Sequence, residues 1–404
     1  KDGTAGKIRC CGFIKPQESS GLRPKVCKGP LSVRTRHVWH MMSKQTDMRH
    51  VLIVFLALAL LMPGSGCGSH RTPERMIGIK IYDYDGDFGL LAERWDKMGI
   101  NTAFVSKDLA ANAEFRQVLK EHEIKTFIIF PVFYDPAALK EDSSLYAVTD
   151  RGRKARESWV EFVCPSRHGF RNRKIREAAD LARELKPDGM SIDFIRHFVF
   201  WEMIYPDRTA GSIDMACFCD SCTGAFLAGQ GISLPDSCIR VGQKSEYIID
   251  HYQDEWNDYR TGLIASMAEG IADALHRVNP DLKIMIHAVP WRDADFDGAN
   301  IRVAGQDLKK LAACADYISP MCYSQMLRRD AGWISSVVKE ADGKAPGMIV
   351  PSIQVYPAYI DDPFSVDDFR RCVDAAVAEP SLGVIFFSWP LFERDPERIE
   401  AVRF

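Results

Sequence analysis

The sequence predicts an α/β domain of the (β/α)8 TIM-barrel type, with an insertion after the fourth strand that carries a cysteine cluster. Eight apolar runs of strand length alternate with helix-like segments from residue 76 to the C-terminus. The runs are apolar almost without a break, which is typical of parallel strands buried on both faces. Polar and aromatic residues follow many of these runs, at the end of the barrel where active sites lie.

The first half of this domain contains four predicted strands. They are "MIGIKIYDY" (76–84), "NTAFVS" (101–106), "KTFIIFPVF" (125–133) and "MSIDFI" (190–195). Between them lie the amphipathic segments "GLLAERWDKMG" (89–99), "AEFRQVLKEHE" (113–123) and "RKIREAADLAREL" (173–185). A longer insertion at 134–170 carries mixed charges and aromatic residues.

The second half repeats the pattern after a long excursion. Its strand runs are "LKIMIHAVPW" (282–291), "DYISPMCYS" (316–324), "GMIVPSIQVYP" (347–357) and "GVIFFSWPLF" (383–392). Helical patterns are expected at 245–279, 305–315, 333–341 and 366–378. A doubly wound open sheet is the competing fold. It would commonly place a Gly-rich phosphate loop after its first strand, and "YDYDGDFG" lacks that pattern.

The composition is that of a globular protein with a large core, since 46% of the 404 residues are apolar and 26% are charged. The formal net charge of −3 conceals an asymmetry. Residues 1–47 hold ten Lys and Arg against three Asp and Glu, which leaves about −10 for the rest. A nucleic-acid-binding domain would show a basic face, so the composition argues against nucleic acid as a partner.

The N-terminal residues have the character of a leader and an export signal. Residues 1–47 lack apolar periodicity and are expected to be an upstream or unstructured leader. Residues 48–67 combine a short positive start, an apolar core and small residues before Cys67, which is typical of a secretory signal. The cysteine after "GSG" is similar to that of a bacterial lipoprotein signal, although Gly64 stands where Leu is usual.

We therefore expect an exported protein, periplasmic or on the cell surface, that meets the membrane only through an N-terminal lipid anchor. The catalytic domain is expected at 76–404. An uncleaved membrane anchor is the alternative, but the apolar core of the signal falls short of the length that spans a bilayer.

Eight cysteines lie beyond Cys67, and export would permit disulfides. Four of them lie close together in the sequence: Cys217, Cys219, Cys222 and Cys238. This spacing indicates a small zinc site or two local disulfides. Four thiolates leave a metal no open position, so we expect such a site to stabilise a loop. No cofactor is expected to be required for catalysis.

The ends of the predicted strands carry an acidic and aromatic set of side chains. In "DGMSIDFIRHFVFWE", Asp193 and Arg196 interrupt an apolar run, and burying an unpaired carboxylate would cost several kcal/mol. Both residues are explained if the strand ends there and opens into the barrel mouth. Aromatic rings stack on sugars and polar groups bind hydroxyls, so we expect a polysaccharide or oligosaccharide partner. The substrate-binding candidates are Arg196, Trp201, His287, Trp291, Tyr323, Gln354, Trp389 and Glu393.

Three of these candidates have a structural alternative. His287 could be a hydrogen-bonded barrel histidine. Tyr323 and Trp389 could fill the interior layers of the barrel, where bulky side chains are common.

The segment "WVEFVCPSRHGFRNRKIREAADLARELKPDGMSIDFIRHFVFWE" resembles a family of hypothetical bacterial glycosyl hydrolases with a (β/α)8 barrel. The "CFCDSC" insertion and "PWR…GQDL…SPMCYSQM" are similar to secreted glycosidases of the same kind. The resemblance covers most of 76–404 and implies a glycosidase. It also implies that Asp193 is the leading catalytic carboxylate, with Arg196 as its neighbour.

The same strand can be aligned with the motif D-G-x-D-x-D-x-E of chitinase-like family 18 barrels. Asp188, Gly189 and Asp193 match that motif. Ser191 replaces its middle Asp, and Ile195 stands where the proton-donating Glu should be. The sequence therefore does not support the mechanism of that family.

Glycoside cleavage by paired carboxyl groups needs a second one beside Asp193. The candidates are Glu202, Asp293 and Glu393. Glu202 is favoured because "FVFWE" places its charge next to Trp201. Asp193, Glu202 and Asp293 are the predicted catalytic residues.

The predicted function is glycoside hydrolysis by carboxylate acid/base catalysis at the C-terminal mouth of the barrel. The main alternative is a lipoprotein on the same fold that binds glycans without cleaving them, which Ile195 leaves open. A scaffold assembled through the cysteines is a weaker alternative. A metal-dependent hydrolase would commonly place an H-x-H pair on the first strand, and "IKIYDYD" contains no His. The sequence specifies neither the sugar, the linkage, the stereochemistry nor the oligomeric state.

Overall fold

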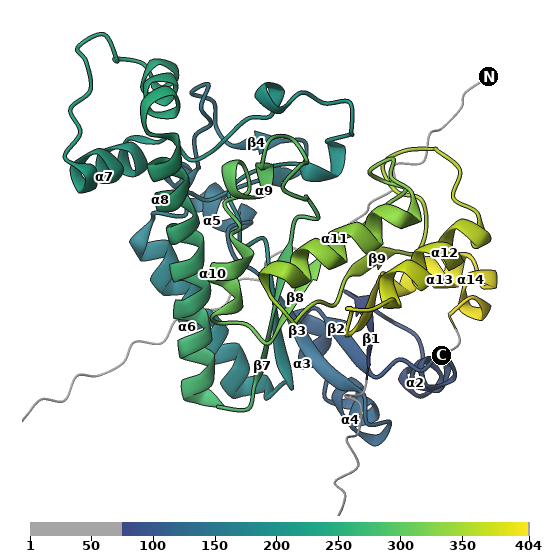
Figure 1. The fold of residues 1–404 in the computed structure, drawn as a ribbon. Helices are drawn as coiled ribbons and strands as arrows, with labels where there is room; N and C mark the ends of the chain where they lie inside the picture. Colours follow the sequence, from purple (N-terminus) through teal and green to yellow (C-terminus); the bar gives the residue numbers. More distant parts are fainter. Residues whose placement is uncertain (1–74, 403–404) are drawn as a thin grey trace, which may run out of the picture. The chain divides into compact units, whose positions relative to one another are not determined.

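The structure is a computed structural model that describes residues 75–402. Eight parallel strands form its centre (Figure 1): β1 (Met76–Ile81), β2 (Thr102–Val105), β3 (Lys125–Pro131), β6 (Gly189–Asp193), β7 (Lys283–Ala288), β8 (Tyr317–Pro320), β9 (Ser352–Gln354) and β10 (Gly383–Phe387). Their order is β8–β7–β6–β3–β2–β1–β10–β9. Parallel bridges from Ile318 to Ile349 and from Met321 to Ser352 bring β8 and β9 together, so the barrel is nearly closed. The predicted fold class is confirmed.

All eight strands overlap the predicted runs, and most of them end before the runs do. The seventh run, 347–357, contributes only β9. The apolar residues after a strand are buried in the mouth of the barrel, and apolar composition records burial rather than strand pairing. Hydrophobic runs therefore located the strands but overestimated their length.

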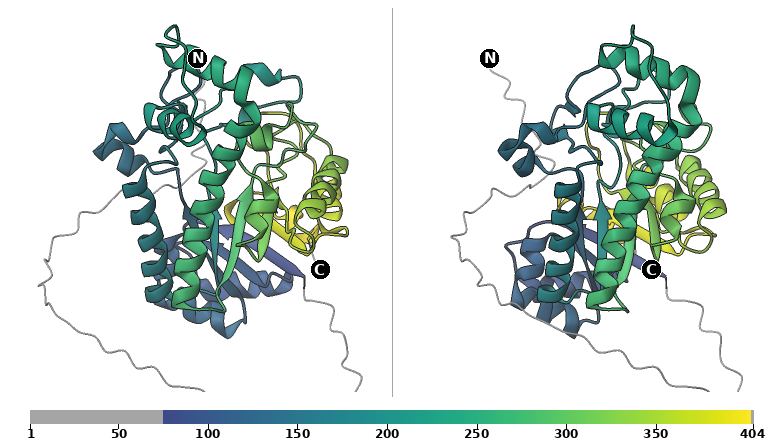
Figure 2. Two further views of the ribbon diagram at one scale, coloured as in Figure 1. Left: turned by 60° about the vertical axis from the view of Figure 1, so that its left-hand side comes forward. Right: turned by 90° about the vertical axis from the view of Figure 1, so that its left-hand side faces the viewer.

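The helices surround the barrel (Figure 2). They are α2 (Phe88–Lys97), α3 (Lys107–Ala111), α4 (Ala113–Glu121), α5 (Pro136–Glu141), α6 (His168–Leu185), α7 (Asp220–Gln230), α8 (Val241–Val278), α9 (Ala299–Arg302), α10 (Leu308–Ala312), α11 (Ala331–Lys344), α12 (Val366–Val377), α13 (Trp389–Arg394) and α14 (Glu397–Glu400). Asp87, Ser106 and Asn112 cap α2, α3 and α4 by accepting backbone N–H groups. The long α8 lies beside α6 and leaves helical geometry at Tyr252.

Two long connections build the rim at the C-terminal ends of the strands. The connection after β3 contains the 3-10 turn η1 (Ser143–Leu145) and the antiparallel pair β4 (Arg156–Glu157) and β5 (Val160–Glu161). The connection after β6 contains the turns η2 (Trp201–Met203) and η3 (Ala210–Ser212), followed by α7. An antiparallel bridge between Thr149 and Ala216 joins the two connections.

The lower part of the barrel interior is filled by side chains. Phe104, Phe127, Met285 and Ile385 belong to one buried cluster there. Gly189 is required by this packing, because a Cβ atom at that position would lie 2.3 Å from the Phe127 ring. A filled lower interior leaves the C-terminal end of the barrel as the place for a site.

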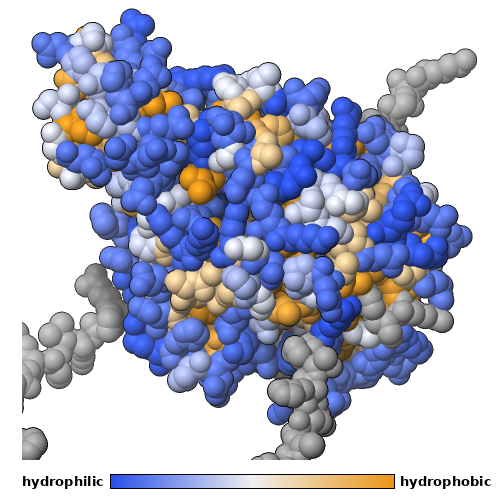
Figure 3. Space-filling view, viewed as in Figure 1, coloured by the Kyte–Doolittle hydropathy of each residue, from blue (hydrophilic) through white to orange (hydrophobic). Residues whose placement is uncertain are grey.

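The predicted leader at 1–47 and the export signal at 48–67 lie outside the described residues. Among residues 75–402, no helix combines the length and the apolarity needed to cross a membrane. On the face shown in Figure 3 the surface is mostly hydrophilic, with apolar residues in scattered places.

Candidate active site at the barrel mouth

A cavity of about 460 Å³ opens at the C-terminal ends of the strands, and we call it the mouth cavity. Its charged lining consists of Lys80, Asp83, Asp193, Arg196, Glu202 and Arg394. Its aromatic lining consists of Tyr82, Trp159, Phe194, Trp201, Tyr323, Tyr359 and Phe387. Five of the residues predicted from the sequence meet here: Asp193, Arg196, Trp201, Glu202 and Tyr323.

Asp193 is the last residue of β6 and is buried at the base of the mouth cavity. Its Oδ1 accepts the backbone N–H of Phe194 at 2.7 Å. Burial by itself would raise the pKa of this carboxyl. The charges of His287 and Lys80 oppose burial, as do the N–H of Phe194 and the guanidinium of Arg196, and the resulting pKa lies below the usual value. Asp193 is therefore ionised at neutral pH.

His287 acts on Asp193 only when the imidazole is protonated. Burial lowers the pKa of His287 to about 3, so the ring is neutral at pH 7. Its Nε2 lies 2.7 Å from the Oγ of Ser191, and its side chain does not line the mouth cavity. At neutral pH the charges that hold Asp193 ionised are those of Lys80 and Arg196.

Lys80 is a member of the site that the sequence analysis missed. It is the fifth residue of β1, and only 1% of it is exposed. A single Lys in the otherwise apolar run "MIGIKI" was the available signal, because a buried ammonium needs a nearby negative charge. Asp193 supplies that charge.

Glu202 lies on the 3-10 turn η2, in the loop that follows β6. Burial raises the pKa of Glu202 to about 7, and the positive charge of Arg196 only partly opposes this effect. The buried Oε2 of Glu202 has no hydrogen-bond partner among the described residues. The mouth cavity thus holds one carboxyl group with a lowered pKa and one with a raised pKa, the arrangement that separates a base from an acid.

Arg196 is held by the chain itself. Its guanidinium donates to the carbonyl oxygen of Val199 at 2.9 Å and lies over the rings of Phe162 and Phe194. With 2% exposure it has little freedom to follow a substrate. Arg196 therefore supplies a fixed positive charge that acts on both Glu202 and Asp193.

Tyr323 and Trp201 form an aromatic floor. The Tyr323 ring stacks on Phe387 at 5.1 Å between centroids and packs against Trp201 at 5.6 Å. Burial raises the pKa of the Tyr323 hydroxyl well above its usual value, so it remains a neutral hydrogen-bonding group. Both residues are more than nine-tenths buried, so they belong to the core as well as to the cavity.

The aromatic wall on the other side of the cavity was not predicted. Trp159 packs edge-on against Phe194 and Phe200, and its indole N–H donates to the Tyr359 hydroxyl at 3.1 Å. Trp159 and Tyr359 stand 200 positions apart in the sequence, on connections that show no periodic pattern. Both are partly exposed, which leaves their rings accessible to a sugar face.

Replacing Trp159 by Ala is expected to raise KM for a glycan substrate about tenfold while changing kcat little, because a stacking ring that binds substrate and transition state equally affects KM alone. Initial rates over a range of substrate concentrations would separate the two constants. Trp159→Phe is the matched control, since it keeps a smaller aromatic ring and loses the indole N–H that donates to Tyr359. A loss confined to kcat would contradict this role.

Two predicted carboxylates lie outside the mouth cavity. Asp293 is exposed and its carboxylate binds Lys344 at 2.5 Å, so it is not a partner for Asp193 in this cavity. Glu393 lies on α13, 3.6 Å from Arg94. The turn that follows β7 points Asp293 towards α11, which the sequence did not reveal.

Three further candidates are engaged in packing. Trp389 is fully buried against Trp95, and Trp291 is buried against Phe296. Gln354 accepts the N–H of Met326 and donates to Gln325 and to a backbone carbonyl, which holds neighbouring loops together. None of the three lines the mouth cavity. Trp389 therefore fills the interior, which was the structural alternative to substrate binding for this residue.

The cysteine cluster differs from the predicted set in one member. The sulfur atoms of Cys164, Cys217, Cys219 and Cys222 lie within 4.8 Å of one another, and all four residues are buried. Cys238 is not among them, because the chain continues past α7 before it reaches that residue. Cys164 comes from the connection after β3, which the bridge between Thr149 and Ala216 brings to the insertion.

The geometry of this sulfur group fits a tetrahedral metal better than disulfides. The Sγ of Cys164 lies 3.6 Å from that of Cys219 and 3.4 Å from that of Cys222. Four sulfurs about 2.3 Å from a zinc ion would be about 3.8 Å apart, whereas a disulfide needs about 2.05 Å. The backbone N–H of Val148 donates to the Sγ of Cys217 at 3.3 Å, a contact that suits a thiolate.

A buried cation next to the sulfur group supports negative charge there. Arg260 on α8 is fully buried and donates to the carbonyl oxygens of Ala216, Arg302 and Val303. Among the described residues no carboxylate lies within ion-pair distance of it. A guanidinium left without a counter-charge in the interior is costly. Thiolates beside Ala216 would provide that counter-charge.

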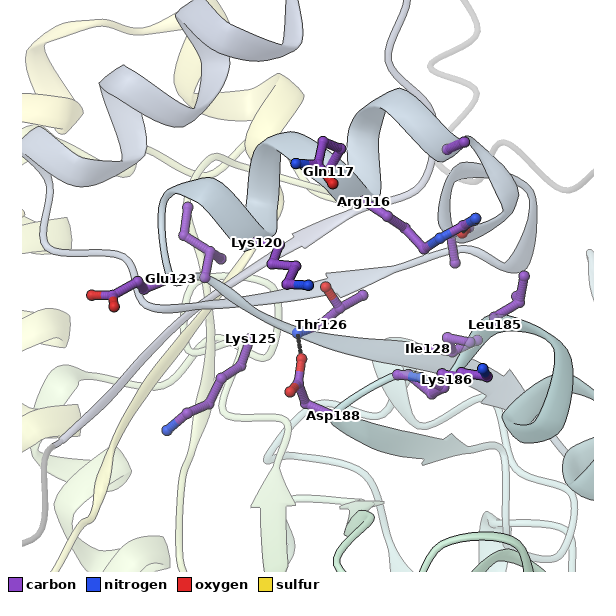
Figure 4. Close-up of a pocket in the computed structure, with 14 residues that line it drawn as sticks. Arg116, Gln117, Lys120, Glu123, Lys125, Thr126, Ile128, Leu185, Lys186 and Asp188 are labelled. Carbon is purple, nitrogen blue, oxygen red and sulfur yellow. Dashed lines mark hydrogen bonds between the residues drawn. The ribbon is translucent and has the colours of Figure 1, made fainter.

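A second hollow, of about 570 Å³, lies at the opposite end of the barrel (Figure 4). There the carboxylate of Asp188 accepts the backbone N–H of Thr126 at 2.7 Å and so joins β6 to β3. Its other charged residues include Arg116, Lys120 and Lys125. In barrels of this type the N-terminal end serves stability, so this hollow is not the candidate active site.

Comparison with known proteins agrees with this fold. No family model and no curated protein matches the sequence. The glycoside hydrolase domain of PgaB (BpsB) from Bordetella bronchiseptica has a similar structure, with a TM-score of 0.60 and 15% identity over 82% of this chain and 98% of that one.

Two β-galactosidases are also similar in structure. The enzyme from Bacillus circulans sp. alkalophilus gives a TM-score of 0.57 at 14% identity over 78% of this chain and 50% of that one. The enzyme from the haloarchaeon Halorubrum lacusprofundi gives 0.56 at 12% identity over 78% and 52%. The chain spans about half the length of these two β-galactosidases. These three solved structures are thus glycoside hydrolases with a (β/α)8 barrel.

Proposed function

We propose that the protein is a glycoside hydrolase that acts on a polysaccharide or glycan. The observation that carries this proposal is the pair of buried carboxyl groups in the mouth cavity, one with a lowered and one with a raised pKa. Glycoside cleavage needs this combination, an acid for the leaving oxygen and an ionised carboxylate for the anomeric centre. The structural similarity to glycoside hydrolases supports the proposal through the fold.

In the proposed mechanism Glu202 is the general acid and Asp193 its ionised partner. The proton of Glu202 passes to the glycosidic oxygen as the bond between that oxygen and the anomeric carbon breaks. Asp193 acts on the anomeric carbon as nucleophile or as the base that activates water, and its charge stabilises the oxocarbenium-like transition state. If Asp193 is the nucleophile, water then breaks the bond between Asp193 and the anomeric carbon, and Glu202 takes one proton of that water. If Asp193 is the base, it takes this proton itself as water attacks. In both cases the remaining hydroxyl group of the water forms the new reducing end.

The experiment that tests this proposal is the release of reducing ends from a panel of bacterial and plant polysaccharides. Release by the full chain would support a glycosidase. Glycan binding without release from any member would instead support the alternative, a glycan-binding protein on the same fold. The opposed pKa values favour catalysis, since binding alone has no use for a protonated carboxyl group next to an ionised one.

The value of kcat/KM should fall as the pH rises, with a midpoint near pH 7, because Glu202 must be protonated to act as the acid. Glu202→Gln should lose this limb and most of its activity on natural glycans. It should keep more activity on aryl glycosides, whose leaving groups need little help from an acid. An unchanged alkaline limb in Glu202→Gln would assign the acid to another residue.

The same carboxyl group should make stability depend on pH. The folded pKa of about 7 lies above the usual value of 4.5 for a glutamate, so the folded state holds this proton more tightly than the unfolded chain. The stability that this bound proton contributes is fully present below about pH 4.5 and is lost as the pH rises through about 7. Glu202→Gln should therefore gain stability relative to the wild type at pH 8 but not at pH 4, as measured by urea unfolding.

We also propose that the four clustered cysteines hold a structural zinc ion. The residues would be Cys164, Cys217, Cys219 and Cys222, and the ion would join the connections after β3 and β6. Four thiolates would leave zinc no open position, so no catalytic step passes through this site. The sulfur distances and the buried Arg260 support a metal over disulfides.

A further inference from the structure

Beside the mouth cavity lies another hollow, of about 430 Å³, with a concentration of positive charge. Its basic lining residues are Arg151, Arg153, Lys154, Arg156 and Arg208, and its acidic ones are Glu157 and Asp214. We call it the basic cleft. The chain beyond residue 47 carries about −10, so the cleft is opposite in sign to the net charge of that part of the chain.

Part of this positive charge is not neutralised among the described residues, although Arg156 lies 3.8 Å from the carboxylate of Glu161. Asp214 is the shared partner of Arg151, at 3.4 Å, and of Arg153. Arg208 donates to the hydroxyl of Ser212 at 2.8 Å and to its carbonyl at 3.3 Å, and no carboxylate of residues 75–402 forms an ion pair with it. About half or more of the side chains of Arg151 and Arg153 is exposed, so an external anion can reach them.

The basic cleft and the mouth cavity share a wall. Phe200 lines the cleft, and its ring packs edge-on against Trp159 and Tyr359 at 5.8 Å in both cases. Trp159 and Tyr359 line the mouth cavity. Glu157, which lines the cleft, stands two residues before Trp159. A chain molecule that leaves the mouth cavity over this aromatic wall therefore reaches the basic cleft next.

We propose that the basic cleft binds the continuation of an acidic polysaccharide whose scissile bond lies in the mouth cavity. The inference rests on the proposed glycosidase function and specifies its substrate class. Guanidinium groups match carboxylate and sulfate groups in geometry and charge. A neutral glycan would gain nothing from the cleft, whereas a repeating anion would gain at each arginine that it passes.

Affinity electrophoresis of the full chain tests this directly. The gels would contain polygalacturonate or, as the matched neutral probe, its methyl-esterified form. We expect a Kd about tenfold lower for the acid form at low salt, since exposed ionic contacts are individually weak but add along a chain. This preference should shrink as NaCl is raised, because salt screens exposed charges.

Two triple variants locate the effect. Arg151→Gln, Arg153→Gln and Arg208→Gln together should remove the preference for the acid form. Arg116→Gln, Lys120→Gln and Lys125→Gln remove three positive charges at the opposite end of the barrel and should leave it intact. Equal losses in both variants, or no preference in the wild type, would overturn the inference. Stronger retardation by duplex DNA than by polygalacturonate would also overturn it.

These outcomes are separate from those of the glycosidase proposal. Release of reducing ends from neutral glycans, with KM unaffected by the cleft variant or by salt, would overturn the acidic substrate and keep the glycosidase. Binding of the acid form that depends on the cleft arginines, without release of reducing ends from any glycan, would overturn the glycosidase and keep the cleft as a site for acidic polysaccharides.

Discussion

Asp193→Asn is expected to lower kcat for glycan cleavage by about 10³-fold or more. Asn has nearly the same shape, and its amide oxygen can still accept the N–H of Phe194 at the end of β6. It carries no charge, so it can neither attack the anomeric carbon nor stabilise the cationic transition state. Reducing-end assays give kcat and KM, and calorimetric titration gives the affinity for the glycan, which should be retained.

Asp293→Asn is the matched control for this experiment. It makes the same chemical change on an exposed carboxylate that pairs with Lys344 outside the mouth cavity. Its activity and melting temperature should stay close to those of the wild type. Equal activity of Asp193→Asn and Asp293→Asn would remove Asp193 from the mechanism.

With the proposed zinc site, Cys164→Ser is expected to abolish zinc binding and to lower the free energy of unfolding by about 3–5 kcal/mol, since loss of a structural metal is among the most destabilising changes. Cys164 is the member of the sulfur group that comes from the connection after β3, so its loss would remove one of the links between that connection and the insertion. Elemental analysis should find about one zinc per wild-type chain. Urea unfolding measures the stability.

Cys238→Ser is the control here, because its side chain lies outside the sulfur group. Metal content and stability should not change in this variant. A mass loss of two hydrogens for each disulfide, together with an absence of zinc, would contradict the metal site. Zinc content that depended on Cys238 and not on Cys164 would contradict the set of ligands.

The sequence alone was sufficient for the barrel. Strands such as β1 and β7 are buried on both faces, so each leaves an apolar run that can be recognised locally. The position of Asp193 could be predicted for the same reason, because a carboxylate at the end of such a run marks where the strand enters the mouth. Glu202 was favoured as its partner because "FVFWE" places that charge next to Trp201 in the same loop.

Other residues that line the mouth cavity could not be predicted from apolar runs and the residues that follow them. Trp159 and Tyr359 meet across 200 positions, on connections whose paths are decided by packing. Trp389 shows the opposite error, since its position after β10 suggested the mouth while the start of α13 turns it towards Trp95. A strand end fixes where the chain leaves the barrel, but not which way the next side chains point.

The cysteines show the same division. The spacing C-x-C-x-x-C identified Cys217, Cys219 and Cys222, and closeness in sequence then suggested Cys238 as the fourth. The structure places Cys164 there instead, 58 positions before Cys222. Periodicity and spacing are local properties and were therefore legible in the sequence. The complete sulfur group and the aromatic wall depend on two long connections that meet over the barrel, and only the packing of the folded chain decides that meeting.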